Sequence, residues 1–442
     1  MVSRKGKGRS ASKLDLTKLD LTKARLLYCT PCGHNVVQVK DDPRYAFLAR
    51  SGVRLVRPPA EDLIPLPYGS FYVVLPERTL AYQNLKGEVR PWPKHWAVGT
   101  FLSSGYLRTL LPSYIPNGSA PPLSLWAYAA VTEIKGKLYT PAVRIDDDPR
   151  SDPALHENDD ELLLAIEEVV GLFPQNRLVG QLAYCATEYR CLCARNFFLG
   201  RYEAPVPTSP VCNAHCLGCL SHQDKASGVE ASQHRLTFAP TPEEIAEVMS
   251  LHLGRVKGGV VSFGQGCEGE PLLRGKDLAQ AIRLTRQKVA RGTINLNTNG
   301  SLPQMAQEMF QAGLDAMRVS FNSLVPESYG RYFLGPNPHY SMQDVFKTIA
   351  LALDAGVKVA INLFVLPGFT DTARERDALF AFLQKYPIDM IQTRNLNIDP
   401  DYYLQKMDFK DAPALGIRAW LQEIRREFPK IRLGYYNPAW KK

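Results

Sequence analysis

The stretch Cys212–Cys219, with the sequence CNAHCLGC, places three cysteines within eight residues and governs how the chain on either side of it is interpreted. Four thiolates normally saturate a 4Fe–4S cubane, so three on one short loop would hold three irons and leave the fourth open to an outside ligand. An open metal position is a place for chemistry. Structural zinc with His222 as a fourth ligand is the alternative, although zinc sites usually pair two ligand groups separated by about a dozen residues or more.

The composition is that of an ordinary globular protein. The chain has 442 residues, of which 45% are hydrophobic and 22% are charged, so it can form two or three domains with a large core. No apolar stretch approaches the roughly 20 residues that cross a bilayer, and the amino terminus lacks the apolar segment of a secretory signal. We therefore expect a cytoplasmic protein without a membrane partner, whose nine cysteines remain thiols.

Basic charge is concentrated at the amino terminus. Residues 1–25 carry eight Lys and Arg side chains against two Asp, in a chain with a net charge of +9. The segment is polar and repeats LDLTK, so we expect a solvated, disordered basic tail over 1–25. An arm for nucleic acid is the alternative. It would rely on phosphate attraction alone, because the segment has no aromatic side chain to stack on a base.

Two sequence textures follow the tail. Residues 26–200 contain short β-rich runs between Pro-dense turns, for example at 69–76 and 123–131, so we expect a smaller α+β or mostly β amino-terminal domain there. The polar segment 146–160 is interpreted as a surface connection, with a helix over 160–172.

From about residue 205, strand patterns alternate with helical patterns. Strands are expected at 258–264, 293–297, 316–321, 357–366 and 389–395, and helices near 241–253, 277–290, 303–311, 341–355 and 372–384. Together with the segment before Cys212, these make six βα units. They predict an α/β fold with a partial (βα)6 barrel over 205–435, in which ligands bind at the carboxyl ends of the strands.

Polar motifs stand at these strand ends. The motif Glu268-Gly269-Glu270-Pro271 follows the strand at 258–264, and Asn297-Thr298-Asn299-Gly300 ends the next strand. Ser320 and Asn322 are two residues apart on an extended strand, so we expect both on one face, where they can hydrogen-bond a ribose diol. The Glu270 carboxylate can pair with an ammonium group, and a Gly beside it lets backbone carbonyls approach closely. Each motif alone is also compatible with an ordinary turn or cap.

In order and spacing, the CxxxCxxC loop and these motifs resemble the radical S-adenosylmethionine (radical SAM) superfamily over residues 205–435. The resemblance implies a radical-SAM-type partial barrel in which Cys212, Cys216 and Cys219 bind a 4Fe–4S cluster and the fourth iron binds S-adenosyl-L-methionine (SAM). It also implies SAM-binding roles for a set of strand-end residues: Glu268, Gly269, Glu270, Pro271, Asn297, Asn299, Ser320 and Asn322. Gly218 departs from the pattern, which has an apolar or aromatic residue there, so we expect adenine contacts from the strand end at 366–368.

The implied reaction is reductive cleavage of SAM. An electron from the cluster enters the sulfonium and releases methionine and a 5′-deoxyadenosyl radical, which abstracts hydrogen from a substrate. Such an enzyme is oxygen-sensitive and needs a one-electron reductant such as flavodoxin or ferredoxin.

Other residues are candidates for further roles. Gln392 and Arg394 alternate on the last strand and are candidate substrate contacts, with a salt bridge at the barrel mouth as the alternative. Cys267 lies in the turn GQGCEGEP and is a candidate catalytic residue, with simple burial as the alternative. The remaining cysteines are candidates for an auxiliary zinc or iron–sulfur site: Cys29, Cys32, Cys185, Cys191 and Cys193.

These observations favour a radical SAM enzyme that acts on a peptide, a protein or a small molecule. A noncatalytic, zinc-stabilised nucleic-acid-binding protein is the main alternative from another class. It predicts zinc and salt-sensitive binding, whereas the enzyme predicts iron, acid-labile sulfide and 5′-deoxyadenosine. An RNA-modifying radical SAM enzyme would combine both features, although the sequence contains no clear RNA-binding module.

Overall fold

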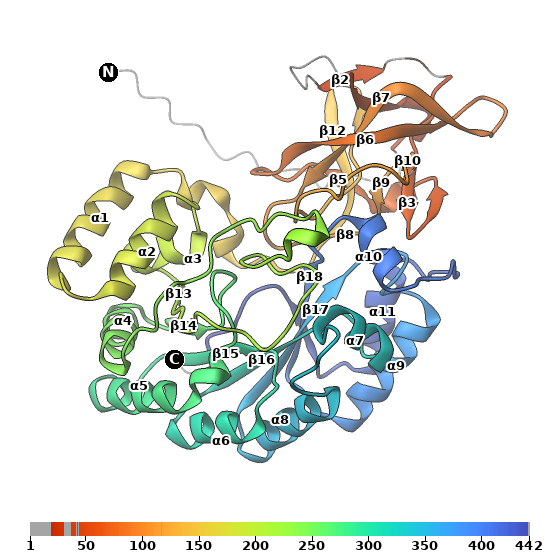
Figure 1. Cartoon of the computed structure of the whole chain (residues 1–442). Helices are drawn as coiled ribbons and strands as arrows, with labels where there is room; N and C mark the ends of the chain where they lie inside the picture. The colour runs from red at the N-terminus through yellow and green to blue at the C-terminus, as the bar shows by residue number, and fades with distance from the viewer. Residues whose placement is uncertain (1–18, 31–36, 41, 43, 116, 441–442) are drawn as a thin grey trace, which may run out of the picture.

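The computed structural model describes residues 19–30, 37–40, 42, 44–115 and 117–440. It places a β-rich domain over one end of a parallel α/β barrel (Figure 1). Most of the predicted basic tail, residues 1–18, lies outside the described residues, as does Cys32. Regular structure begins before the expected domain start at residue 26, because a 3-10 turn at Leu21–Lys23 leads directly into the first strand, β1.

Antiparallel strands build the amino-terminal β domain. Its nine-stranded sheet has the order β10-β6-β7-β1-β11-β12-β5, with β2 paired to β1 and β8 paired to β12, and a three-stranded sheet has the order β4-β3-β9. The strands are β1 (Ala24–Cys29), β2 (Val37–Lys40), β3 (Ala49–Ser51), β4 (Arg54–Val56), β5 (Leu63–Pro65), β6 (Phe71–Gln83), β7 (Val89–Phe101), β8 (Tyr106–Arg108), β9 (Leu111–Pro112), β10 (Tyr114–Ile115), β11 (Thr132–Ile134) and β12 (Lys137–Arg144). The mostly β character predicted for this region is confirmed.

The apolar run at 123–131 does not form the strand that its composition suggests. It is extended and largely buried, with one isolated bridge between Ala129 and Thr100. Its first backbone N–H, on Leu123, donates to the Asp399 carboxylate at 2.9 Å instead of to a neighbouring strand. The run therefore lies between the two parts of the molecule rather than inside a sheet.

Three helices follow the β domain and pack on the barrel. They are α1 (Asp159–Leu172), α2 (Arg177–Thr187) and α3 (Leu192–Phe198). Buried side chains such as Leu178 and Phe197 belong to the same hydrophobic core as Val248 and Ile282 of the barrel. The expected domain limit at residue 200 thus falls after helices whose apolar faces complete the barrel core.

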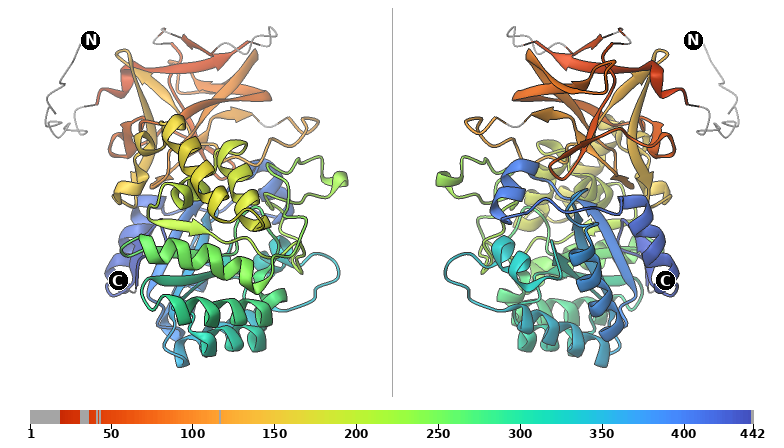
Figure 2. Two further views of the ribbon diagram at one scale, coloured as in Figure 1. Left: turned by 90° about the vertical axis from the view of Figure 1, so that its left-hand side faces the viewer. Right: turned by 90° about the vertical axis from the view of Figure 1, so that its right-hand side faces the viewer.

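The barrel is a curled, wholly parallel sheet with the strand order β13-β14-β15-β16-β17-β18-β19 (Figures 1 and 2). The strands are β13 (Glu203–Pro205), β14 (Val260–Phe263), β15 (Thr293–Thr298), β16 (Ala316–Phe321), β17 (Lys358–Val365), β18 (Met390–Asn395) and β19 (Arg432–Gly434). The six predicted strands are present. β13 is only three residues long because prolines lack the donor that a ladder needs, and β19 extends the sheet by one short strand that periodicity cannot reveal.

Helices cover the outer face of the parallel sheet. They are α4 (Pro242–Arg255), α5 (Gly275–Lys288), α6 (Pro303–Ala312), α7 (Pro326–Phe333), α8 (Met342–Asp354), α9 (Ala373–Lys385), α10 (Pro400–Lys406) and α11 (Ile417–Glu427). Capping boxes form at the starts of α4 and α8, between Thr241 and Glu244 and between Ser341 and Asp344. Within the described ranges, no helix combines the length and the apolar character that crossing a membrane would require.

Buried charge holds the β domain on the barrel mouth. Arg78 of β6 forms an ion pair with Asp399 at 2.6 Å, and both side chains are at most 5% exposed. Arg108 of β8 donates to the Leu396 carbonyl oxygen at 2.8 Å, just beyond the end of β18. Removing one partner of such a buried pair leaves an uncompensated charge, so these contacts specify one docked arrangement. The β domain therefore closes over the carboxyl ends of the late strands.

Candidate functional site

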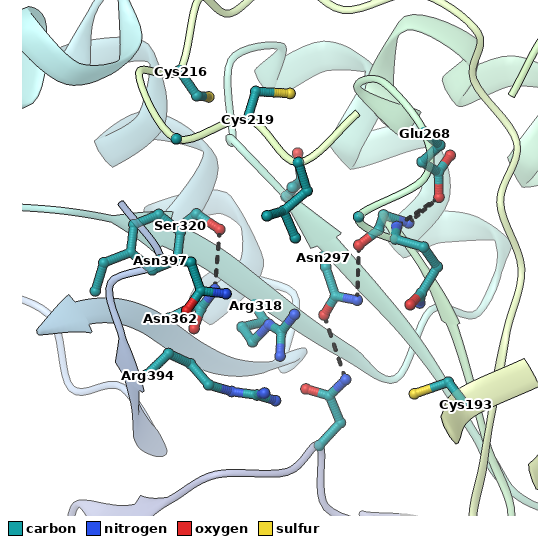
Figure 3. A pocket seen from close by; sticks show the side chains of 18 of the residues that line it. Cys193, Cys216, Cys219, Glu268, Asn297, Arg318, Ser320, Asn362, Arg394 and Asn397 are labelled. Carbon is teal, nitrogen blue, oxygen red and sulfur yellow. Dashed lines mark hydrogen bonds between the residues drawn. The ribbon is translucent and has the colours of Figure 1, made fainter. Parts of the chain in front are cut away.

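A cavity of about 500 Å³ lies at the carboxyl ends of the parallel strands (Figure 3). The cysteine loop 212–219 and the turns after β14 and β15 line one side, and β16, β17 and β18 line the other. Phe101, Leu102 and Ala127 of the β domain also contribute to its wall. Its position matches the ligand end of parallel α/β folds, and its volume is typical of a small-molecule site.

The cysteine loop is tied to α7 by backbone hydrogen bonds. The N–H groups of His215 and Leu217 donate to the carbonyl oxygens of Phe333 and Tyr332 at 2.8 and 3.1 Å. A side chain at Gly218 would approach the Tyr332 hydroxyl oxygen to 2.8 Å. The departure from the superfamily pattern at this position therefore has a steric reason, because Tyr332 occupies the space. Tyr332 lines the cavity and is the aromatic face nearest to this point of the loop.

The expected adenine contact from residues 366–368 is wrong. None of these residues lines the cavity. The turn packs against the β domain instead, where the Gly52 N–H donates to the Pro367 carbonyl oxygen at 2.9 Å. A Cβ on Gly368 would lie 1.9 Å from the Gly52 nitrogen, so this turn is committed to the contact between the two domains.

Two thiols of the loop, Cys212 and Cys216, lie in surroundings that disfavour isolated negative charge. Burial raises the pKa of the Cys212 thiol to about 11, and burial and the neighbouring cysteines raise the pKa of Cys216 well above its usual range. Arg235 donates to the Cys219 sulfur at 3.4 Å. The thiolate forms therefore need a compensating cation, which iron supplies.

The spacing of these ligands also bears on the kind of metal centre. Within the residues that the structure describes, no three His, Cys, Asp or Glu side chains are arranged around one point as ligands of a single ion. In a cubane each thiolate binds a different iron, so the sulfurs need not converge on one point. The donor set thus fits a 4Fe–4S cluster.

The Glu268 side chain has a structural role at the site. One of its carboxylate oxygens accepts hydrogen bonds from the Thr208 and Ser209 N–H groups at 2.7 and 2.9 Å. The other accepts from the N–H groups of Gly264 and Gln265 at 2.7 and 2.8 Å. Both oxygens are used, so the side chain ties the end of β14 to the segment before the cysteine loop. The predicted contact of Glu268 with SAM is therefore not available to its carboxylate.

Glu270 is likewise engaged by its own turn. Its carboxylate accepts from the N–H groups of Leu272 and Asn299 at 3.0 and 2.8 Å, and from the Thr298 hydroxyl. Burial raises the pKa of this carboxyl to about 7. These three contacts leave acceptor capacity on the carboxylate, so its predicted pairing with an ammonium group stays a prediction. Glu270 still lines the cavity, and it holds two of the cavity turns together.

The rest of the same motif brings backbones close together. A Cβ on Gly269 would lie 1.9 Å from the Val211 carbonyl oxygen, and the Glu270 N–H donates to that oxygen at 2.9 Å. Pro271 opens a 3-10 turn, where a missing N–H costs nothing. Gly269 and Pro271 line the cavity as predicted, with backbone rather than side-chain polar groups available to a ligand.

The two predicted asparagines after β15 line the cavity and brace its walls. Asn297 donates to the Phe263 carbonyl oxygen at 2.8 Å. Asn299 donates to the Asn213 side-chain oxygen at 2.9 Å, within the cysteine loop. Both amide groups therefore fix the relative positions of the turns around the loop.

The prediction that Ser320 and Asn322 share a face is wrong. Ser320 lines the cavity, whereas Asn322 is fully buried elsewhere and donates to the Tyr403 hydroxyl at 3.1 Å. The reason is that β16 ends at Phe321, so the alternation of an extended strand stops before Asn322. Asn362 of β17 takes the expected place. It lies opposite Ser320 in register, donates to its hydroxyl at 3.5 Å, and has a side-chain oxygen without a partner.

The two candidate substrate contacts on β18 differ in whether they line the cavity. Arg394 lines the cavity, but Gln392 does not. The Gln392 side-chain oxygen accepts from Arg318 at 2.6 Å, and its nitrogen donates to Asn437 at 2.7 Å. Sequence reasoning missed Arg318, although it lies two residues before Ser320 on β16 and so shares its face. A charged residue inside an otherwise apolar strand was the available signal.

Comparison with known proteins identifies the barrel. The family model of the radical SAM superfamily matches residues 206–381, which include the cysteine loop and the strand ends around the cavity. Residues 206–381 thus form a radical SAM domain. A GTP 3′,8-cyclase of Aeromonas hydrophila is 32% identical over 238 residues, which make up 51% of this chain and 64% of that relative. A probable GTP 3′,8-cyclase of Methanosarcina acetivorans is 31% identical over 207 residues, covering 45% of this chain and 56% of the relative.

The chain therefore spans less than two thirds of the length of these curated relatives. Among solved structures, a radical SAM methyltransferase from Sphaerobacter thermophilus has a TM-score of 0.39 and is 14% identical. That match covers 54% of this chain and 67% of the other.

Cys267 does not reach the radical SAM cavity. Its thiol forms a hydrogen bond with the Cys185 thiol of α2, which raises the pKa of Cys267 and lowers that of Cys185 to about 7. Cys267 is absent from the cavity wall, so the predicted catalytic role is not supported by its position. The polar turn in which it lies gives no sign of which way each side chain points.

The structure does not gather the candidate auxiliary cysteines. Cys29 is packed in the β domain core with Leu27 and Val98, whereas Cys185 lies in the core of the radical SAM barrel. Cys191 precedes α3 and Cys193 lies within it, lining the cavity. For the described part of the chain, these thiols are not arranged around one metal ion.

Several cavity residues come from segments that sequence analysis did not associate with the site. Arg150 and His156 belong to the segment interpreted as a surface connection, yet both line the radical SAM cavity. Tyr435 and Asn437 do so from beyond β19. These residues reach the cavity only through the folded arrangement, so no local sequence signal marks them.

Proposed function

We propose that this protein is a radical SAM enzyme that acts on a small molecule. The observation that carries the proposal is the three-cysteine loop, which lines a cavity at the carboxyl ends of the parallel strands. A reduced 4Fe–4S cluster bound there would supply the electron that cleaves SAM into methionine and a 5′-deoxyadenosyl radical. That radical takes a hydrogen atom from the substrate and becomes 5′-deoxyadenosine.

The residues around the cavity have separate roles in this reaction. Cys212, Cys216 and Cys219 hold the cluster. The Ser320 hydroxyl and the unpartnered Asn362 side-chain oxygen offer hydrogen bonds to the sugar of SAM. The β domain contributes apolar side chains to the cavity wall, which reduces the access of water that could quench a radical.

Two observations favour a small molecule over a peptide or protein. The docked β domain supplies part of the cavity wall, and the cavity volume of about 500 Å³ lies in the range of small-molecule sites. The relatives are named for a reaction of GTP, which is a small molecule. We further propose a cytoplasmic enzyme that receives its electron from a flavodoxin or a ferredoxin. An RNA substrate and a zinc-stabilised nucleic-acid-binding protein have no support from the site.

The test is anaerobic reconstitution of the full chain with iron and sulfide, followed by SAM and a one-electron reductant. We expect iron and acid-labile sulfide in cubane proportion and formation of 5′-deoxyadenosine. Cys212→Ala, Cys216→Ala and Cys219→Ala should each abolish the product. Cys29→Ala, which removes a thiol from the β domain core, should retain it. Zinc without iron uptake, or product from the three loop variants, would overturn the proposal.

A further inference from the structure

We propose that Arg318 and Arg394 form a binding site for an oxyanion, a phosphate or carboxylate group, that is carried by the substrate. This inference rests on the proposed function, because it assigns one side of the same cavity to the substrate. Arg318 lies on β16 and Arg394 on β18, and both line the cavity. Figure 3 shows them near each other on the side away from Cys216 and Cys219.

The two guanidinium groups have no carboxylate partner in the described structure. Arg318 donates to the neutral side-chain oxygen of Gln392 at 2.6 Å. The Arg394 guanidinium lies 3.8 Å from the centre of the Tyr435 ring. The Nε atoms of both arginines are buried without a hydrogen-bond partner. Such orphaned donors are uncommon in folded proteins, and an oxyanion bound between the two guanidinium groups would satisfy them.

The charge around the two arginines is not balanced by their neighbours. Glu203 is the acidic residue whose charge acts on Arg318. Its carboxylate already accepts hydrogen bonds from Ser262 and Asn437 at 2.6 Å each, and it lies 3.8 Å from Arg150. Burial and the proximity of Arg394 lower the pKa of Arg318. Two like charges in a partly buried cavity are unfavourable unless an anion joins them.

The chemistry of the pair selects an oxyanion. A guanidinium is a planar fork of donors that matches the two oxygens of a carboxylate or phosphate. Gln392 fixes the orientation of Arg318, and Tyr435 packs against the plane of Arg394, so the donors are held ready. An anion at this position is separated from the cysteine loop by the Ser320–Asn362 pair, where we place the sugar of SAM. The site therefore suits the substrate rather than the cofactor.

The experiment measures anion binding without turnover. The full chain, purified anaerobically with and without its reconstituted cluster, is titrated with pyrophosphate and separately with succinate, by calorimetry and thermal shift. We expect one anion per chain, with at least tenfold weaker binding in Arg318→Gln and Arg394→Gln. Arg394→Lys keeps the charge without the fork and should fall between. Arg283→Gln removes the same charge from the exposed face of α5 and should bind like the unaltered chain.

The outcomes separate the alternatives. Binding of pyrophosphate alone supports a phosphorylated substrate, and binding of succinate alone supports a carboxylated one. Failure of both probes to bind, or equal affinity in both Gln variants and the unaltered chain, would overturn the inference. Mutual exclusion of SAM and the anion would also overturn it, because the arginines would then serve the cofactor. Since no step requires 5′-deoxyadenosine, failure of the proposed function would be seen separately.

Discussion

The two sides of the cavity use their polar groups in opposite ways. On the cysteine side, Glu268, Glu270 and Asn299 are occupied by hydrogen bonds to neighbouring backbone and side chains. On the strand side, Arg318 and Arg394 keep donors without partners. The difference indicates that the cysteine side is a rigid scaffold, which offers thiol groups and backbone polar groups to a cofactor. The other side holds free groups that a ligand must satisfy.

The largest effect is expected from breaking the scaffold at Glu268. Glu268→Gln replaces one acceptor oxygen by an amide nitrogen that faces backbone donors. Hydrogen bonds to a buried charged group are worth about 1.5–3 kcal/mol each, so we expect a loss of about 3–5 kcal/mol of unfolding free energy. Denaturant unfolding and iron content measure the change. Glu167→Gln on the exposed face of α1 should be neutral, and equal behaviour of the two variants would refute the scaffold role.

A smaller effect should follow from crowding the cysteine loop. Gly218→Ala places a methyl group 2.8 Å from the Tyr332 hydroxyl oxygen, and overpacking costs about 1–3 kcal/mol. We expect less iron retained per chain after reconstitution. The double variant with Tyr332→Phe removes the clash and should recover iron binding. Absence of that recovery would show that the loop is limited by something other than this contact.

The strand side can be tested by supplying Arg318 with a charge partner. Gln392→Glu places a carboxylate where the neutral oxygen accepts from Arg318, so it competes with an external anion. We expect pyrophosphate to bind about tenfold more weakly, which corresponds to about 1.4 kcal/mol. Calorimetry provides the measurement. Unchanged affinity would mean that Arg318 does not contribute its charge to the site.

The smallest effect is expected where the two sides meet. Asn362→Ala removes the amide opposite Ser320 and should weaken SAM binding about two- to tenfold, as expected for one hydrogen bond of about 0.5–1.5 kcal/mol. Equilibrium dialysis with SAM measures the affinity, and Asn158→Ala, at the start of α1, is a control outside the cavity. A stronger loss of pyrophosphate binding than of SAM binding would reverse the assignment of this pair.

Local sequence patterns predicted the barrel well, because the periodicity and the turn residues of each βα unit lie within a short stretch of sequence. The helices that begin near Thr241 and Ser341 are present, and the polar turns after β14 and β15 meet the cysteine loop because parallel strands end at one edge. Which way a side chain faces was less predictable. The Asn322 side chain points away from the cavity because its strand ends one residue earlier. The Cys267 thiol forms a hydrogen bond with the Cys185 thiol of α2 instead of facing the cavity.

Residues fixed by long-range packing could not be predicted from the sequence. Asn362 and Arg318 reach the cavity through strand register, and Arg150 reaches it from the connection between the β domain and α1. The same holds for α1 to α3, whose apolar faces match the barrel only once the core is assembled. A single sequence shows the hydrophobic periodicity of a helix or strand, but it does not show which other helix or strand that element packs against.

The buried pair of Arg78 and Asp399 has a practical consequence for dissecting this molecule. A fragment that begins at residue 205 would keep the aspartate without its arginine and would lose the helices that cover one flank of the barrel. Such a fragment would expose apolar surface and an unpaired charge together, which favours aggregation over a simplified catalyst. Expression trials should therefore start from the undivided polypeptide.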